Sequence, residues 1–171
     1  TGKVILVTGA ASGIGAATCH AARAEGAKLV ACDRAEEESI RDGSGATEAD
    51  MVAHLDVTDE GGVDACVTEV LTRYGQIDGL VNCAGIQTPG AAHTIDLATW
   101  NRVLGVQLTG SFIVARRVVR EMLKTGRGSI VNIASIYGMT GGPGNVSYNT
   151  AKGGILQLTR SMAADYGKSG I

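Results

Sequence analysis

Residues 3–15 read KVILVTGAASGIG, an apolar run that passes directly into three closely spaced glycines. The run Lys3–Thr8 is short, continuous and rich in β-branched residues, which is typical of a strand buried on both faces. Gly9, Gly13 and Gly15 then fall in a turn that leads into a helical pattern. Glycines there let the backbone approach a pyrophosphate, and the helix supplies free N–H groups and a positive dipole end. Taken alone, the glycine triplet is a weak signal for a phosphate-binding loop, and a plain tight turn is the alternative interpretation.

The rest of the chain alternates between strand-like and helix-like patterns. We expect helices over Ile14–Glu25, Asp59–Tyr74, Leu97–Lys124 and Ser147–Tyr166, and strands over Ala27–Asp33, Met51–Val57, Ile77–Asn82 and Gly128–Ala134. The acidic segment Arg34–Asp50 predicts a loop with at most a ragged helix. Because the strands alternate with helices, we expect an α/β fold with a doubly wound parallel sheet, formed by residues 1–171 as a single domain.

Composition and charge argue against several function classes. The chain has 171 residues, of which 44% are hydrophobic and 19% charged, enough for one packed core. Its net charge of −2 is spread along the sequence, so we expect neither a nucleic-acid nor a membrane partner. Three isolated histidines predict no metal site, and four scattered cysteines predict reduced thiols. We therefore expect a soluble, cytoplasmic protein that acts on a small molecule.

Polar residues mark the ends of the second and third expected strands, where parallel sheets bind ligands. Asp33 lies 18 residues after Gly15, close to the spacing at which an acid accepts hydrogen bonds from adenosine ribose hydroxyls. A carboxylate there would repel a 2′-phosphate, which favours NAD over NADP. Arg34 beside it either pairs with such a phosphate or is a solvated loop charge. Asp56 and Val57 are placed to meet the adenine.

The fourth strand is followed by Asn82-Cys83-Ala84-Gly85, an amide with a small-residue backbone against which a cofactor can lie. Asn82 equally suits a structural role that bridges neighbouring strands.

Tyr148 and Lys152 stand four residues apart on the last expected helix, and so share one face about one turn apart. An ammonium fixed near the phenol stabilises its phenolate form, which suits acid/base chemistry. Ser135 ends the fifth expected strand, 13 residues before Tyr148, and can donate a hydrogen bond to a substrate oxygen. The YxxxK spacing alone is common on helices, whereas its combination with Ser135 and the preceding motifs is not.

Together these motifs, in this order and spacing, resemble the short-chain dehydrogenase/reductase family in its TGxxxGxG branch, over essentially the whole chain. The resemblance implies a Rossmann-like fold and hydride transfer between NAD(H) and a secondary alcohol or ketone. It implies that Tyr148 is the general acid/base. It also implies that Lys152 lowers the pKa of Tyr148 and binds the nicotinamide ribose, and that Ser135 orients the substrate oxygen. It also implies a homodimer or homotetramer. The implied cofactor-binding residues are Gly9, Ser12, Gly13, Ile14, Gly15, Asp33, Arg34, Asp56, Val57, Asn82, Ala84, Gly85, Tyr148 and Lys152.

Two features depart from the family pattern. Gln107, in the stretch VQLTG, occupies the fourth catalytic position, where relatives carry an Asn that holds a helix kink and a water relay to the Lys. The longer Gln predicts a relay that is shifted rather than lost, and it leaves impaired activity as an open alternative. After Ile171 relatives continue through a further strand, a Pro-Gly turn, a mobile substrate loop and a final strand. We therefore expect the C-terminal strands to be missing and the domain to be incomplete.

Two rival functions remain at this point. A cofactor-binding family member with little or no turnover is consistent with Gln107 and with the missing C-terminal part. The sugar-nucleotide epimerases, whose loop reads TGxxGxxG, fit less well because three residues separate the first two glycines here. An active NAD-dependent dehydrogenase or reductase is the leading hypothesis.

Overall fold

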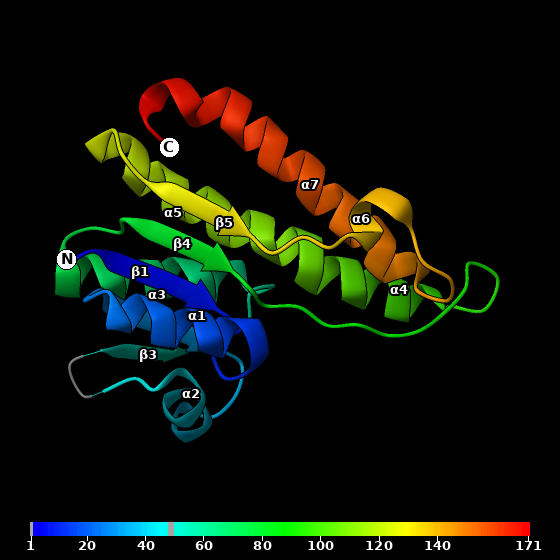
Figure 1. Ribbon diagram of the computed structural model, residues 1–171, viewed down its shortest axis with the longest axis horizontal. Helices are drawn as coiled ribbons and strands as arrows, with labels where there is room; N and C mark the ends of the chain where they lie inside the picture. Colours follow the sequence, from blue (N-terminus) through cyan, green and yellow to red (C-terminus); the bar gives the residue numbers. More distant parts are fainter. Residues whose placement is uncertain (1, 48–49) are drawn as a thin grey trace.

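A parallel five-stranded sheet lies at the centre of the computed structural model, which describes residues 2–47 and 50–171 (Figure 1). Its order is β3-β2-β1-β4-β5. The strands are β1 (Val4–Thr8), β2 (Lys28–Asp33), β3 (Met51–His54), β4 (Gly79–Asn82) and β5 (Ser129–Asn132). The chain builds outward from β1 to one edge and returns to β4 on its other side. This reversal places a topological switch point at the carboxyl ends of β1 and β4.

Helices cover both faces of the sheet, as expected of a Rossmann-like α/β fold. They are α1 (Gly13–Ala24), α2 (Glu37–Ser44), α3 (Glu60–Tyr74), α4 (Leu97–Leu104), α5 (Ser111–Thr125), α6 (Tyr137–Thr140) and α7 (Val146–Tyr166), with a π-helical segment η1 (Gly105–Gly110) and a 3₁₀ turn η2 (Gly167–Ser169). The predicted fold class is confirmed. No helix in the described ranges is long and apolar enough to cross a membrane.

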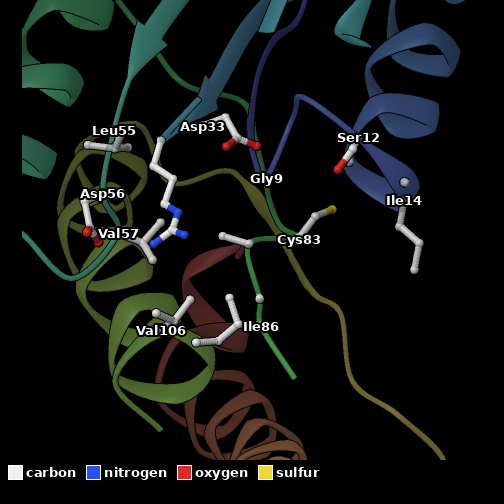
Figure 2. Close-up of a pocket in the computed structure, with 15 residues that line it drawn as sticks. Gly9, Ser12, Ile14, Asp33, Leu55, Asp56, Val57, Cys83, Ile86 and Val106 are labelled. Atoms are coloured by element: carbon white, nitrogen blue, oxygen red, sulfur yellow. The ribbon is translucent and has the colours of Figure 1, made fainter. Parts of the chain in front are cut away.

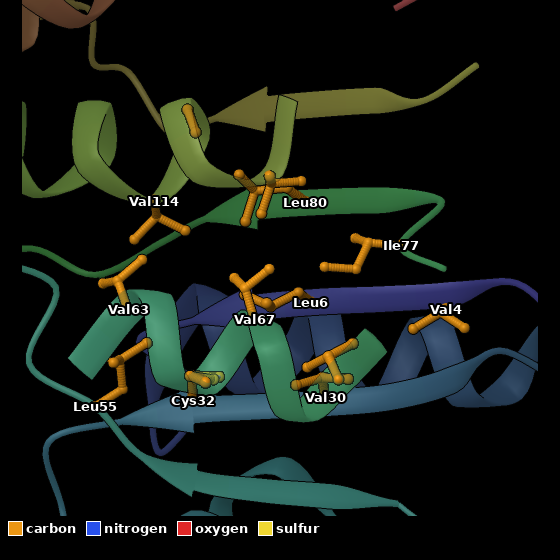
Figure 3. Close-up of a cluster of buried hydrophobic side chains, with 14 of the residues drawn as sticks. Val4, Leu6, Val30, Cys32, Leu55, Val63, Val67, Ile77, Leu80 and Val114 are labelled. Atoms are coloured by element: carbon orange, nitrogen blue, oxygen red, sulfur yellow. The ribbon is translucent and has the colours of Figure 1, made fainter. Parts of the chain in front are cut away.

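The core is divided between the two faces because successive strand residues point in opposite directions. Leu6 of β1 packs on the side of α3 and α5, against residues such as Val67 and Val114 (Figure 3). Its neighbour Val7 packs on the opposite side, with Cys19 of α1 and Ile40 of α2. Strands buried on both faces explain the continuous apolar run at the start of the chain.

The segment after β2 differs from the prediction of a loop with at most a ragged helix. An eight-residue helix, α2, forms there, although residues 48–49 lie outside the described ranges. Its single large apolar residue, Ile40, is fully buried, and Gly45 ends the helix in the left-handed conformation at φ 65°. The helix buries only Ile40 and Ser44, a signal too weak to find in an acidic, glycine-containing stretch.

Two further elements differ from the prediction by more than a shift of two residues at one end. The expected helix Leu97–Lys124 is divided into α4, η1 and α5, so Gln107 lies in a π-helical turn. The third strand ends at His54 instead of Val57, because the carboxylate of Asp56 bonds both N–H and Oγ of Thr58 in a tight turn.

Candidate active site

A cavity of about 340 Å³ opens at the carboxyl ends of the strands (Figure 2). The glycine loop and the start of α1, with Ser12 and Ile14, form one side, and the residues after β3 form the other. It is lined by Gly9, Ser12, Gly13, Ile14, Gly15, Asp33, Arg34, Leu55, Asp56, Val57, Cys83, Ala84, Gly85, Ile86 and Val106. The structure thus brings together eleven of the sequence-predicted cofactor residues around one hollow.

Glycine is required at two positions of this loop for steric reasons. A Cβ on Gly9, which has φ 68°, would lie 2.8 Å from the backbone nitrogen of Ala84. A Cβ on Gly15 would collide with the carbonyl oxygen of Gly9. The loop therefore packs closely against the segment after β4 and against its own helix.

The start of α1 is prepared to hold an anion. Ser12 is the N-cap, but its side chain makes no capping hydrogen bond, and the described first turn carries no acidic residue. N–H groups at a helix start have no partner within the helix, and the dipole there attracts negative charge. A pyrophosphate fits this end of the cavity.

Asp33 is fixed at the end of β2 by two backbone groups. Its carboxylate accepts hydrogen bonds from the N–H of Ala11 and the N–H of Ala35, each at 3.1 Å. Each oxygen keeps a free lone pair, and the residue lines the cavity, so ribose hydroxyls can donate to it.

Asp56 lies across the cavity from the start of α1 (Figure 2). The N–H and O–H of Thr58, at 2.8 and 2.7 Å, hold the pKa of the Asp56 carboxyl below its ordinary value, and Arg34 adds to this effect. The carboxylate at this end is therefore charged across the neutral pH range.

Asn82 does not line the cavity but bridges strands beneath it. Its Nδ2 donates to Oδ1 of Asn132 at 2.9 Å and to the carbonyl of Ser111 at 3.3 Å. The Oγ of Thr8 accepts from the N–H of Ala84 at 3.2 Å, which ties the end of β1 to the same segment. Of the two roles that the sequence left open for Asn82, the structural one matches these contacts.

Tyr148 and Lys152 lie on α7, outside the lining of the cavity. The Lys152 ammonium is 5.7 Å from the centroid of the Tyr148 ring, and it donates to the carbonyl of Ile133 at 2.5 Å. Lys152 is buried, and burial lowers its pKa, an effect opposed by the thiol of Cys83. Cys83 lines the cavity, so the ammonium is influenced electrostatically by a residue of the cavity wall.

Ser135 begins the segment that leads into α6. Its Oγ accepts from the N–H of Tyr137 at 3.2 Å, so its own proton remains free for another acceptor. A Cβ on Gly138 would lie 2.7 Å from the carbonyl carbon of Lys152, so α6 packs tightly on α7 close to Lys152. Within residues 2–47 and 50–171, no hydrogen bond joins Ser135 to Tyr148.

Comparison with known families gives one match that spans the chain. The family model described as short chain dehydrogenase matches residues 3–171. The chain belongs to the short-chain dehydrogenase family.

Two curated relatives illustrate the similarity. The chain is 41% identical to cis-4-hydroxycyclohexanecarboxylate dehydrogenase of Sinomonas cyclohexanicum, over 99% of this chain and 69% of that protein. It is 42% identical to 3-alpha-(or 20-beta)-hydroxysteroid dehydrogenase of Mycobacterium bovis, over 99% of this chain and 65% of that protein. The chain thus spans about two thirds of the length of these relatives.

A solved structure shows the same backbone. A crystal structure described as ribose-5-phosphate isomerase from Brucella melitensis 16M matches with a TM-score of 0.92 at 35% identity, covering 99% of this chain and 65% of that one. The two proteins therefore share one backbone fold over 99% of this chain.

In this family member, four cavity residues were missed by the sequence analysis as cofactor contacts. They are apolar or weakly polar: Leu55, Cys83, Ile86 and Val106. Ile86 and Val106 face one another in Figure 2 and close one wall of the cavity. All four stand directly beside a predicted site residue in the sequence, so extending each predicted motif by one residue would have found them.

Gln107 of this short-chain dehydrogenase points to the segment after β4. Its Nε2 donates to the carbonyl of Ile86 at 2.9 Å, while its buried Oε1 has no hydrogen-bond partner among the described residues. A Cβ on Gly85 would lie 2.8 Å from this oxygen. No hydrogen bond in the described part of the chain joins Gln107 to Lys152. The amide is therefore placed to hold a cavity wall.

Proposed function

We propose that the chain binds NAD(H) in this cavity and exchanges a hydride between the nicotinamide and a secondary alcohol or ketone. The observation that carries the proposal is the buried Lys152 ammonium, which lies 5.7 Å from the Tyr148 ring and is influenced electrostatically by Cys83, a residue that lines the cavity. Burying a cation costs free energy, and a negative charge that forms on the neighbouring phenol offsets this cost.

Different cavity residues would bind different parts of the dinucleotide. The glycine loop and the start of α1 hold the pyrophosphate, Asp33 accepts from the adenosine ribose, and Asp56 and Val57 border the adenine. The Asp33 carboxylate favours NAD, because it repels a 2′-phosphate. Arg34 lines the same end and is the residue through which NADP would bind instead.

Three side chains carry the proton chemistry. The bound cofactor supplies or accepts the hydride. Tyr148 gives its proton to the substrate oxygen during reduction and accepts it as phenolate during oxidation. Lys152 stabilises the phenolate, and Ser135 donates its free hydroxyl proton to the substrate oxygen. We assign Gln107 to this site as well, as the residue that holds the Ile86 wall.

The substrate class follows from the curated relatives. Both are named as dehydrogenases of a hydroxylated compound, one a hydroxycyclohexanecarboxylate and one a hydroxysteroid. We infer a secondary alcohol or ketone for this chain also.

We further propose a cytoplasmic homodimer or homotetramer. Phe112 and Leu123 of α5 are each 43% exposed, and such apolar side chains on a long helix suit burial against a second copy. All four cysteines are free thiols, which matches a reducing compartment. Light scattering of the full-length protein tests the assembly, and a monomer would contradict it.

The function is tested by titrating the full-length protein with NADH and NADPH and then measuring turnover on a panel of secondary alcohols. We expect tighter binding of NADH, and turnover that falls about 10³-fold in Tyr148→Phe. Tyr166→Phe, at the far end of the same helix, serves as the matched control and should keep wild-type turnover. NADH binding without turnover in the wild type would favour the cofactor-binding alternative, and no binding would overturn both.

A further inference from the structure

A line of side-chain hydrogen bonds joins the ends of β4 and β5 to α7. Asn82 and Asn132 face each other in the register of the two strands, and Nδ2 of Asn82 donates to Oδ1 of Asn132 at 2.9 Å. Nδ2 of Asn132 donates to Oγ1 of Thr159 at 3.0 Å, and Thr159 donates to the carbonyl of Ile155 at 2.8 Å. Every donor in this line points toward the helix.

The direction of the line is set by the groups at its two ends. Thr159 has one proton, which it gives to Ile155, so toward Asn132 it can only accept. Both protons of the Asn82 amide are used, on Asn132 and on the carbonyl of Ser111. The middle position therefore needs an acceptor and a donor on one short side chain, which Asn supplies and Asp or Leu does not.

The same helix is attached to the end of β5 at a second point. Lys152 donates to the carbonyl of Ile133, the residue directly after Asn132. The N–H of Ile133 in turn donates to the carbonyl of Asn82 at 3.1 Å. Lys152 and Thr159 are seven residues apart, which is two helical turns, so they share one face of α7 about 10 Å apart.

We propose that Asn132 and Thr159 form a positioning pair, which holds α7 on the end of β5 so that the Lys152 ammonium keeps its hydrogen bond to the Ile133 carbonyl while it lies beside Tyr148. The inference rests on the proposed function, because the pair acts through Lys152 and touches no reacting atom. The titratable groups that face the ammonium are the Cys83 thiol, from the segment after β4, and Tyr148 on α7 itself.

Burial makes the position of Lys152 important. Burial lowers the pKa of this ammonium, so its charged state depends on fixed acceptors such as the Ile133 carbonyl. If α7 shifts along β5, the ammonium loses this acceptor and little water is available to replace it, so its charged form is disfavoured and the phenolate of Tyr148 has less positive charge beside it. The pair should therefore control how far down in pH the phenolate can act.

The test compares Thr159→Val, which keeps the shape but removes the acceptor, with Thr159→Ser, which restores it. Asn132→Ala is the second disruptive variant. Thr72→Val on α3 is the matched control, because the Thr72 hydroxyl also bonds the carbonyl four residues earlier, at 3.0 Å, but far from the site. For each full-length variant, kcat, the KM for NAD⁺ and the pH profile of kcat/KM for alcohol oxidation are measured.

We expect Thr159→Val and Asn132→Ala to lower kcat about five- to tenfold, with the KM for NAD⁺ changed less than about twofold. The acid limb of their pH profiles should move to higher pH by about half a unit to one unit. Thr159→Ser and Thr72→Val should keep the wild-type profile.

Two results would overturn the inference while leaving the proposed function intact. One is a wild-type pH profile and kcat in both disruptive variants. The other is a lower kcat without any shift of the acid limb, which would indicate general destabilisation. A wild-type protein that binds NADH but turns over no alcohol would overturn both proposals together.

Discussion

The two ends of the parallel sheet each hold a carboxylate that accepts backbone N–H groups, and they differ in what else surrounds it. At the amino ends, Asp78 precedes β4 and accepts from the N–H of Val4 at 2.9 Å and from Gln76 at 2.7 Å. Lys3 and Arg127 lie 3.6 and 3.8 Å from its Oδ1. This carboxylate is buried, and its charge is compensated within the chain.

At the carboxyl ends, Asp33 accepts two backbone N–H groups, whereas Asp78 accepts one together with the Gln76 side-chain amide, and no cation pairs with Asp33 among the described residues. It lines an open cavity beside an uncapped helix start. The comparison separates stability from function: the amino ends complete their own polar contacts, whereas the carboxyl ends leave donors and acceptors for a ligand.

The largest expected effect comes from Gly15→Ala, which disrupts the cavity at the carboxyl ends of the sheet. The added Cβ collides with the Gly9 carbonyl, so the loop has to move, and NADH affinity should fall more than about 100-fold. Gly167→Ala is the control, because nothing lies within 4 Å of its Cβ and its φ is −57°. Fluorescence titration measures both. Wild-type affinity in Gly15→Ala would place the dinucleotide elsewhere.

Asp33→Asn should weaken NADH binding about 10- to 100-fold, because hydrogen bonds to a charged group contribute more than those to a neutral amide. NADPH binding should fall less, since the repulsion of its 2′-phosphate is removed. The ratio of the two dissociation constants is the measurement, with the exposed Asp42→Asn as control. An unchanged ratio would mean that Asp33 does not select the cofactor.

Asp78→Asn tests the amino ends of the sheet, and it should change the free energy of unfolding but not cofactor binding. Burial by itself raises the pKa of Asp78, but the Val4 N–H, Gln76 and the two cations outweigh it, so the net pKa is lowered. A carboxyl with a lowered folded-state pKa stabilises the protein above its unfolded pKa, and this stability is lost as pH falls through the folded value.

We therefore expect Asp78→Asn to lower the free energy of unfolding by about 1–2 kcal/mol at neutral pH. The difference from wild type should shrink as urea titrations are carried below about pH 4. NADH affinity should stay unchanged. A difference that is constant with pH would show that the charge of Asp78 is not what stabilises the amino ends.

The smallest effect is expected from Gln107→Asn, which shortens the amide that holds the Ile86 carbonyl. Loss of one hydrogen bond to a cavity wall should raise the KM for NAD⁺ about two- to fivefold with little change in kcat. A more than tenfold rise in kcat would instead show that Gln107 impairs a proton relay, as the sequence departure suggested.

The strand ends were predictable because buried parallel strands and glycine turns leave local signals. The run Lys3–Thr8 and the residue types at Gly9 and Asp33 were enough to place the cavity. The helix α2 was not predictable, since its formation depends on Ile40 meeting the sheet. The sequence pattern likewise located Gln107 at the site but did not indicate where its side chain points. The side chain donates to the Ile86 carbonyl from a π-helical segment that the sequence did not predict.

The central claim, that a nicotinamide dinucleotide occupies the carboxyl-end cavity, is tested most directly by alkylation of Cys83. This thiol lines the cavity and is half-buried, whereas Cys19, Cys32 and Cys66 are buried. Burial raises the pKa of Cys83, so the reaction is run at mildly alkaline pH and each site is followed by mass spectrometry. We predict that saturating NADH slows modification of Cys83 at least about tenfold in the wild type and fails to do so in Gly15→Ala. Equal rates of Cys83 modification with and without bound NADH would contradict the account.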